Sequence, residues 1–184
     1  MRMQEGTRVN PTVQVRRVQA ADIPHVIALD TRVTRIAKTE YWKDIFSRYG
    51  RQRSRERFFL IAEGCVNRSA AADFLGFIIG EIRAWEFGSS PCGWVFALSV
   101  EPKVRLHGIG SALLARCLEF ARTVGYERMM LWTHSVLLEA RRLYAREGFR
   151  LIRTEPHTLF GLPLTGEFWE LTLSPSARAD PALD

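Results

Sequence analysis

The sequence predicts an α/β protein in which helices pack against a mixed β-sheet, and three observations support this fold class. Short apolar runs typical of buried strands alternate along the chain with amphipathic segments of helical period. A length of 184 residues suits a single domain with a full hydrophobic core. Hydrophobic residues make up 47% of the chain and charged residues 25%, a composition that excludes a disordered or fibrous protein.

The first part of the chain is expected to contain one strand and two helices. After a polar tail over 1–11, closely spaced valines predict a strand that begins at Val13. Apolar residues at helical spacing then predict a helix over Ala21–Asp30, with Asp22 as its N-cap. A second helix is expected over Thr34–Tyr49.

A basic run, RQRSRER, follows from Arg51 to Arg57 and places an arginine at every second position. Such a run fits a contact with phosphate or nucleic acid. A solvated loop between a helix and a strand is the preferred interpretation, and a phosphate or nucleic-acid contact is the alternative.

The remainder of the chain is expected to supply most of the sheet and two more helices. The run WVFALSV lacks polar alternation, so Gly93–Val100 is predicted to be a central strand buried on both faces. Helices are expected over Gly108–Val124 and over Val136–Glu147, the second closed by Gly148. The order β-α-α-β-β-β-α-β-α-β-β contains about six to seven strands and about four helices. The other expected strands cover Phe58–Ala62, Phe74–Ile82, Met129–Trp132, Phe149–Arg153 and Glu167–Leu173.

The net charge indicates the kind of partner, and the cysteines indicate the cellular compartment. The formal net charge of +6 favours an anionic partner such as a phosphate-rich cofactor, nucleic acid or a membrane surface. Cys65, Cys92 and Cys117 lack the close spacing of a zinc site or a disulfide framework, so reduced thiols and no metal are expected. No secretory signal or long apolar segment is evident, which predicts a soluble, cytoplasmic protein.

The stretch Ala97–Leu114 carries the clearest chemical signal. Pro102 removes a backbone donor and ends the strand before it. Gly108 and Gly110 then open a helix, where glycine lets a ligand approach the backbone closely. The unpaired amides of a helix start, its dipole and nearby cations favour a pyrophosphate. The sequence contains neither a Walker A loop nor a complete dinucleotide-binding fingerprint.

Two motifs resemble those of the GNAT superfamily of acyl-CoA-dependent N-acetyltransferases. The loop Arg105–Gly110, RLHGIG, matches the family pattern R/Q-x-x-G-x-G/A, and Val100–Pro102 is similar to its strand-end signature. The segment Ala140–Phe149, ARRLYAREGF, resembles the family motif A-x-x-x-Y-x-x-x-G-F. The resemblance covers 12–173. Over Trp132–Leu173 it is most similar to acetyltransferase domains attached to bacterial winged-helix regulators of the MarR type.

This resemblance implies a GNAT fold, with a mixed, mostly antiparallel sheet that splays between its fourth and fifth strands to hold acetyl-CoA. A single domain over 12–173 is then expected, with flexible tails over 1–11 and 174–184. A backbone amide near the splay would polarise the thioester carbonyl. The residues implied to bond the pantetheine arm through their backbone are Leu98, Ser99 and Val100. Those implied to cradle the pyrophosphate are Arg105, Leu106, His107, Gly108, Ile109, Gly110 and Ser111, with Lys103 as a further cation.

The resemblance also implies catalytic roles. Tyr144 would protonate the departing thiolate, while simple packing on the sheet is the alternative reading of this side chain. The general base that removes the amine proton is Glu81 in the first interpretation, with Glu63 and His134 as further candidates. Many family members carry an asparagine at the position of Leu137, so this cofactor contact is expected to differ here, and Ser135 or His134 are the candidate replacements.

The function expected from these residues is transfer of an acetyl group from acetyl-CoA to a primary amine by direct attack in a ternary complex. The acceptor would be a small molecule or a peptide, bound by loops over Thr31–Arg57 and Thr158–Gly166. An acyl-CoA sensor with little catalysis is the alternative. Neither nucleic acid nor a membrane is an expected partner, and a homodimer is left open. Aromatic candidates for the acceptor pocket are Tyr41, Trp42, Trp85 and Phe160, with core packing as the alternative and as the preferred reading for Trp42.

Overall fold

A computed structural model describes residues 13–50, 56–64, 73–83, 92–158 and 163–173. These residues form a seven-stranded sheet with the strand order β1-β2-β3-β4-β5-β7-β6, in which only β4 and β5 pair in parallel among the described neighbours. The strands are β1 (Val13–Arg17), β2 (Arg57–Gly64), β3 (Asp73–Arg83), β4 (Cys92–Val100), β5 (Arg128–His134), β6 (Arg150–His157) and β7 (Leu164–Thr172). The helices are α1 (Ile23–Thr34), α2 (Thr39–Tyr49), α3 (Ile109–Thr123) and α4 (Leu138–Arg146), with short 3₁₀ helices η1 (Ala20–Asp22) and η2 (Pro102–Val104).

The order of strands and helices is the one that the sequence predicts, and the α/β class with a mixed, mostly antiparallel sheet is confirmed. The main difference lies at the first helix boundary. α1 runs to Thr34, where Arg35 takes a left-handed conformation at φ 63° and its amide bonds to the carbonyl of Thr31. The second helix therefore begins at Thr39 rather than at Thr34.

Asp22 has a different partner from the one that the sequence indicates. Its carboxylate makes no capping bond to α1. Instead it accepts hydrogen bonds from the backbone amide of Gln19 and from the guanidinium of Arg16, both at 2.7 Å. Arg16 also donates to Glu63 at 2.8 Å, so one buried network joins β1, η1 and β2.

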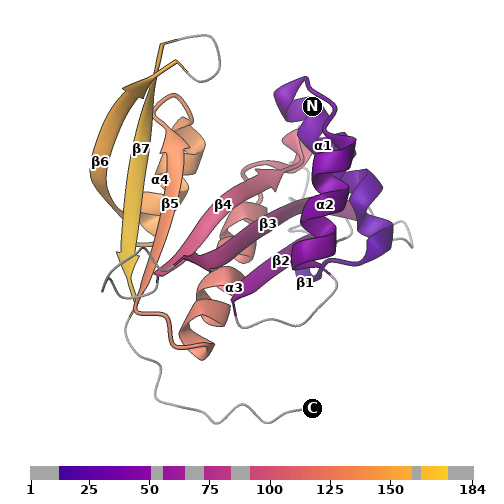
Figure 1. Ribbon diagram of the computed structural model, residues 1–184, viewed down its shortest axis with the longest axis horizontal. Helices are drawn as coiled ribbons and strands as arrows, with labels where there is room; N and C mark the ends of the chain where they lie inside the picture. Colours follow the sequence, from indigo (N-terminus) through magenta and orange to yellow (C-terminus); the bar gives the residue numbers. More distant parts are fainter. Residues whose placement is uncertain (1–12, 51–55, 65–72, 84–91, 159–162, 174–184) are drawn as a thin grey trace, which may run out of the picture.

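The helices cover the two faces of the sheet as separate layers (Figure 1). α1 and α2 pack on one face over a core that includes Val26, Trp42 and Phe77. α3 and α4 pack on the other face over a core that includes Leu113, Cys117 and Tyr144. The two termini and Cys65 lie outside the described residues, as does most of the basic run over 51–57.

The parallel contact between β4 and β5 is short, and the two strands then diverge (Figure 1). Their pairing covers Gly93 to Val95 of β4 and ends there. Phe96 is an extra residue in β4, because Ala97 pairs with Ile79 while Val95 pairs with the next residue of β3. Such a bulge bends a strand and increases its twist, which accounts for the splay at this point.

The bulge also explains why the predicted burial of β4 is confirmed for its first half and wrong for its second half. The strand is buried from Cys92 to Val95, as predicted, but from Phe96 to Val100 it is half-buried. Phe96 and Ala97 both pack toward α1 and α2, whereas Leu98 packs toward α3. The second half of the strand therefore borders an opening in the sheet, and its apolar side chains pack at the edges of the two cores.

Candidate active site

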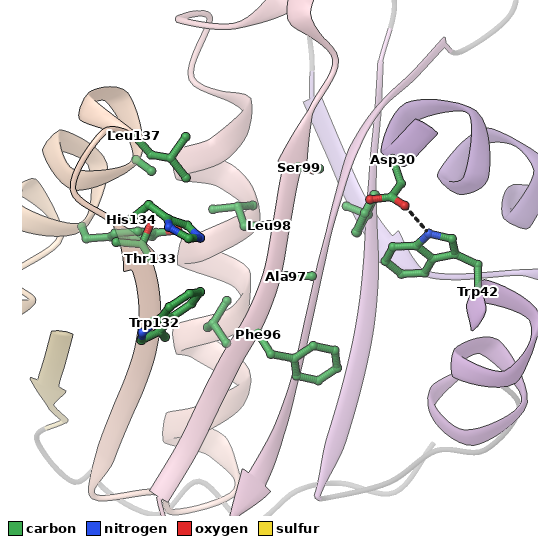
Figure 2. A pocket seen from close by; sticks show the side chains of 14 residues that line it. Asp30, Trp42, Phe96, Ala97, Leu98, Ser99, Trp132, Thr133, His134 and Leu137 are labelled. Atoms are coloured by element: carbon green, nitrogen blue, oxygen red, sulfur yellow. Dashed lines mark hydrogen bonds between the residues drawn. The ribbon is translucent and has the colours of Figure 1, made fainter. Parts of the chain in front are cut away.

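A pocket of about 250 Å³ lies where β4 and β5 separate. Figure 2 shows its two sides, with Asp30 and Trp42 on one side of β4 and Trp132, His134 and Leu137 on the other. The pocket thus reaches residues of both helical layers. Its described lining residues are Asp30, Trp42, Phe77, Val95, Phe96, Ala97, Leu98, Ser99, Trp132, Thr133, His134, Leu137, Ala140 and Tyr144.

The β4 segment predicted to bind a pantetheine arm borders this pocket. Leu98 and Ser99 line it, and Val100 follows at the end of the strand. In the described residues the ladder between β4 and β5 stops at Val95, so the β5-facing backbone edge of β4 has no strand partner beyond that point. Backbone donors and acceptors on such an edge are available to an extended ligand with amide groups.

The predicted pyrophosphate loop joins β4 to α3. Leu106 and Gly108 both adopt left-handed conformations, at φ 66° and φ 83°, which turn the chain sharply into α3. The first helical hydrogen bond runs from the amide of Ala112 to the carbonyl of Gly108. The amides of Ile109, Gly110 and Ser111 consequently have no acceptor within the helix and suit an anion.

Several cations surround this helix start, and one of them was missed from the sequence. Arg105 and Lys103 are exposed, and the Nε of Arg105 donates to the carbonyl of Val100 at 3.3 Å. Arg146, in the last turn of α4, donates to the hydroxyl of Ser111 at 2.6 Å. Because Arg146 and Ser111 are 35 positions apart, only the packing of α4 beside α3 reveals that this cation belongs to the site.

Tyr144 lines the pocket from α4 and is 6% exposed. Burial raises the pKa of Tyr144 to about 12, so its hydroxyl stays protonated at neutral pH and can donate a hydrogen bond. The ring packs near Phe149 and Trp169, at centroid distances of 6.0 and 6.5 Å. The side chain of Tyr144 therefore packs against neighbouring rings and also lines the pocket.

Of the three candidates for the general base, one lines the pocket. Glu63 is bound by Arg16 in the network of β1 and β2. Glu81 accepts a hydrogen bond from the hydroxyl of Tyr49, lies 4.0 Å from Arg57, and is absent from the described lining residues. His134, at the end of β5, is a lining residue. The structure therefore does not bring Glu81 and Tyr144 together in this pocket.

His134 belongs to an aromatic cluster with Trp132 and His157. The ring centroids of His134 and His157 are 5.0 Å apart, and those of His134 and Trp132 are 4.6 Å apart. Burial, together with the neighbouring His157, lowers the pKa of His134 below its ordinary value. The imidazole is therefore neutral at neutral pH, the state in which it can accept a proton.

The opposite side of the pocket contains Asp30, which the sequence analysis did not single out. Its signal was an acidic residue four positions after Val26, on the apolar face of α1. Trp42 packs in the core, the reading preferred from the sequence, and it also lines the pocket, whereas Tyr41 is 46% exposed and does not line it. Trp85 and Phe160, the other aromatic candidates, lie outside the described residues.

Leu137, where an asparagine is common, stands at the N-cap of α4 and lines the pocket half-exposed. Its side chain offers no hydrogen bond to a ligand. Neighbouring lining residues that do carry polar groups are Thr133 and His134.

A splayed sheet with an anion-binding helix start beside the gap defines an acyl-CoA acyltransferase fold, and comparisons with known proteins agree. The structure of NAA60 from Arabidopsis thaliana in complex with acetyl-CoA superposes with a TM-score of 0.72, at 15% identity, covering 88% of this chain and 99% of that one. The putative acetyltransferase yncA from Salmonella typhimurium with acetyl-CoA gives a TM-score of 0.67, at 19% identity, covering 92% and 99%. The GNAT fold is thereby confirmed.

The chain belongs to the acetyltransferase (GNAT) family, whose model matches residues 26–149. An uncharacterized N-acetyltransferase of Schizosaccharomyces pombe is 33% identical over 87 residues, 47% of this chain and 52% of that protein. Mycothiol acetyltransferase of Beutenbergia cavernae is 32% identical over 71 residues, 39% and 23% of the two chains. The chain therefore spans about half or less of these relatives. Neither relative bears on the resemblance to regulator-linked domains, which stays a prediction.

The residues that the structure describes contain no helix long and apolar enough to cross a membrane. They also contain no group of three or more His, Cys, Asp or Glu side chains arranged to hold a metal ion.

Proposed function

We propose that this protein transfers the acetyl group of acetyl-CoA to a primary amine by direct attack in a ternary complex. The observation that carries the proposal is the pocket between β4 and β5, which joins the backbone edge of β4 to Tyr144 and His134. Relatives named as acetyltransferases, and neighbours whose structures contain acetyl-CoA, support the same chemistry.

The residues present fit the pyrophosphate, the pantetheine arm and the thioester of acetyl-CoA. The amides of Ile109 to Ser111 and the guanidiniums of Arg105 and Arg146 would hold the pyrophosphate. The unpaired edge of β4 from Leu98 to Val100 would bond the pantetheine arm. A backbone amide at the splay would donate to the thioester oxygen, on which negative charge develops during transfer.

In the proposed reaction the amine nitrogen attacks the thioester carbonyl carbon. A C–N bond forms, the C–S bond breaks, and the proton of the amine passes to a base on the protein. Tyr144 donates a hydrogen bond to the departing sulfur. Because burial raises the pKa of Tyr144, its hydroxyl gives up its proton reluctantly, and stabilising the thiolate by a hydrogen bond is the role that this side chain suits.

We assign the base to His134 rather than to Glu81. His134 lines the pocket and is neutral at neutral pH, whereas the Glu81 carboxylate is engaged by Tyr49 and Arg57. Glu81 would act only if Tyr49 released it. Mutation distinguishes the two candidate bases. If His134 is the base, His134→Gln should lower kcat about 100-fold, while Glu81→Gln should change kcat by no more than a few-fold.

Calorimetric titration with acetyl-CoA, followed by an assay of free thiol with a panel of amines, tests the proposal. The double variant Arg105→Ala, Gly110→Asp should lose binding, because it removes a cation and adds an anion at the helix start. The variant Arg116→Ala, further along α3 and paired there with Glu119, is the control and should bind normally. Binding without thiol release from any amine would favour the sensor alternative, and absence of binding by the folded protein would contradict both.

A further inference from the structure

The described lining of the pocket includes an acidic side chain and no cationic one, although the chain as a whole is basic. Asp30 is the one formally charged side chain among the described lining residues, which include no lysine or arginine. The net charge of the chain is +6. Asp30 is 7% exposed, so its carboxylate is largely removed from water. A carboxylate in such a place requires positive or hydrogen-bonding partners to offset its desolvation.

The partners of Asp30 show what this carboxylate binds. The indole Nε1 of Trp42 donates to it at 2.9 Å, which fixes one oxygen. The ammonium of Lys38 lies 3.2 Å from the carboxylate, on a side chain that keeps 35% exposure and does not line the pocket. An alkylammonium of the chain itself thus contacts Asp30, and this contact can be exchanged because the lysine reaches water.

Aromatic rings from three elements surround the same side of the pocket. Trp42 of α2 and Phe77 of β3 meet edge to face at a centroid distance of 5.2 Å, and Phe96 projects from the bulge of β4. Figure 2 shows Phe96 directed to the side of β4 on which Asp30 and Trp42 lie. Aromatic faces beside a carboxylate favour an organic cation with an apolar carbon chain.

We infer that the acceptor is a small diamine, in which a carbon chain joins the reacting primary amine to a second, positively charged group that Asp30 holds. This inference rests on the proposed function, since it names the substrate of the same pocket. The reacting amine lies toward His134, on the far side of β4 from Asp30. The ammonium of Lys38 competes with the substrate for the carboxylate.

Charge decides between the alternative acceptors. An acceptor with a carboxylate tail would meet Asp30 as a like charge in a poorly hydrated place, which is unfavourable. An acceptor with a neutral tail would use the aromatic rings but not Asp30. The structure therefore orders three amines of similar length: a diamine first, an alkylamine second and an amino acid last.

The test compares 1,5-diaminopentane, pentylamine and 5-aminopentanoic acid by thiol release from acetyl-CoA. The expected kcat/KM for the diamine exceeds that for pentylamine by about tenfold, and the acid is the poorest acceptor. Asp30→Asn should remove the advantage of the diamine mainly by raising its KM, since an asparagine oxygen still accepts from Trp42. Lys38→Gln should act in the opposite direction and lower the KM for the diamine.

Asp44→Asn is the matched control, because this exposed aspartate of α2 pairs with Arg48 and loses the same charge. It should leave the order of the three amines unchanged. Calorimetric titration of 1,5-diaminopentane into the protein with CoA gives a readout independent of turnover, and its Kd should rise about tenfold in Asp30→Asn.

Different results would contradict the diamine inference and the proposed acetyl transfer. Equal rates for the three amines, an advantage of the diamine that survives Asp30→Asn, or an unchanged KM in Lys38→Gln would overturn the diamine inference and leave acetyl transfer standing. If Asp30 served only to join α1 to α2, its variant would lower stability and affect all three amines alike. Absence of thiol release with every amine, while acetyl-CoA and the diamine both bind, would contradict the proposed function and retain the binding site.

Discussion

At the scale of single residues, the surroundings of two side chains in the pocket reinforce the protonation states that they prefer at neutral pH. Burial holds Tyr144 in its protonated form, and burial with His157 holds His134 in its neutral form. One is thus a donor and the other an acceptor at the same pH. Two residues in opposite protonation states are what an acid–base reaction in one pocket requires.

Replacing Tyr144 with phenylalanine removes the hydroxyl and keeps the ring that packs near Phe149 and Trp169. We expect kcat to fall about 100-fold, with little change in the Kd for acetyl-CoA, because the hydroxyl acts on the leaving sulfur and not on binding. Thiol release and calorimetry measure the two quantities. A Tyr144→Phe variant with full activity would assign this side chain to packing alone.

Replacing His157 with phenylalanine should shift the acid limb of the pH–activity profile to higher pH. His157 lowers the pKa of His134, so its removal lets that pKa rise toward the ordinary value of about 6.5. The base must be neutral to act, and activity therefore fails at a higher pH than in the unaltered protein. If the limb moved in Glu81→Gln and stayed in place in His157→Phe, Glu81 would be the base.

At the scale of helices and strands, an ion pair with a buried carboxylate holds α4, the helix that carries Tyr144, against the sheet. Glu167 of β7 is 3% exposed and accepts hydrogen bonds from Arg141 of α4 at 2.9 Å and from Trp169 at 3.0 Å. One carboxylate therefore holds the helix against the sheet beside the pocket. The predicted acid of the reaction depends on this contact for its position.

The variant Glu167→Gln should lower the free energy of unfolding by about 2 kcal/mol, because it removes the buried carboxylate that accepts from the half-buried Arg141 and from Trp169. Urea unfolding measures the change. Glu139→Gln is the control on the same helix, since its pair with Arg142 is largely exposed and its loss should cost less than about 0.5 kcal/mol. Similar losses for both variants would show that Glu167 does not anchor α4.

At the scale of the whole molecule, the splay of the sheet leaves a gap that a ligand would fill. β4 and β5 are joined by the ladder from Gly93 to Val95 and are apart beyond it. A ligand that bonds β4 and also contacts α3 and α4 would link the two halves of the sheet. Binding to the folded state alone raises its stability.

Acetyl-CoA at 100 times its Kd should therefore stabilise the protein by about 2.7 kcal/mol and raise Tm by roughly 5–10 °C. Thermal unfolding with and without the ligand measures this shift. The variant Arg105→Ala, Gly110→Asp should show none, and high salt should reduce the shift, because phosphate contacts contribute much of the binding. An equal shift in the double variant would place the phosphates elsewhere.

Features that depend on residues adjacent in the chain could be predicted from the sequence. Hydrophobic period predicted the strands and helices in their order. The loop from Arg105 to Gly110 predicted a helix start with free amides, because its glycines and the unpaired amides after it are local properties, and anion binding there stays a prediction. The motif around Tyr144 likewise placed that residue on its helix. The end of α1 was misplaced, since it depends on the left-handed conformation of Arg35, which no glycine signals.

Contacts between side chains that are distant in the sequence could be identified only from the tertiary structure. Arg146 reaches Ser111, and the ring of His157 lies beside His134, because strands and helices distant in the sequence pack side by side. The bulge at Phe96 opens the sheet, and it is visible only in the register between two strands. Asp30 joins the pocket through the packing of α1 and α2. Contacts of this kind depend on distance in space, which hydrophobic period and local motifs do not contain.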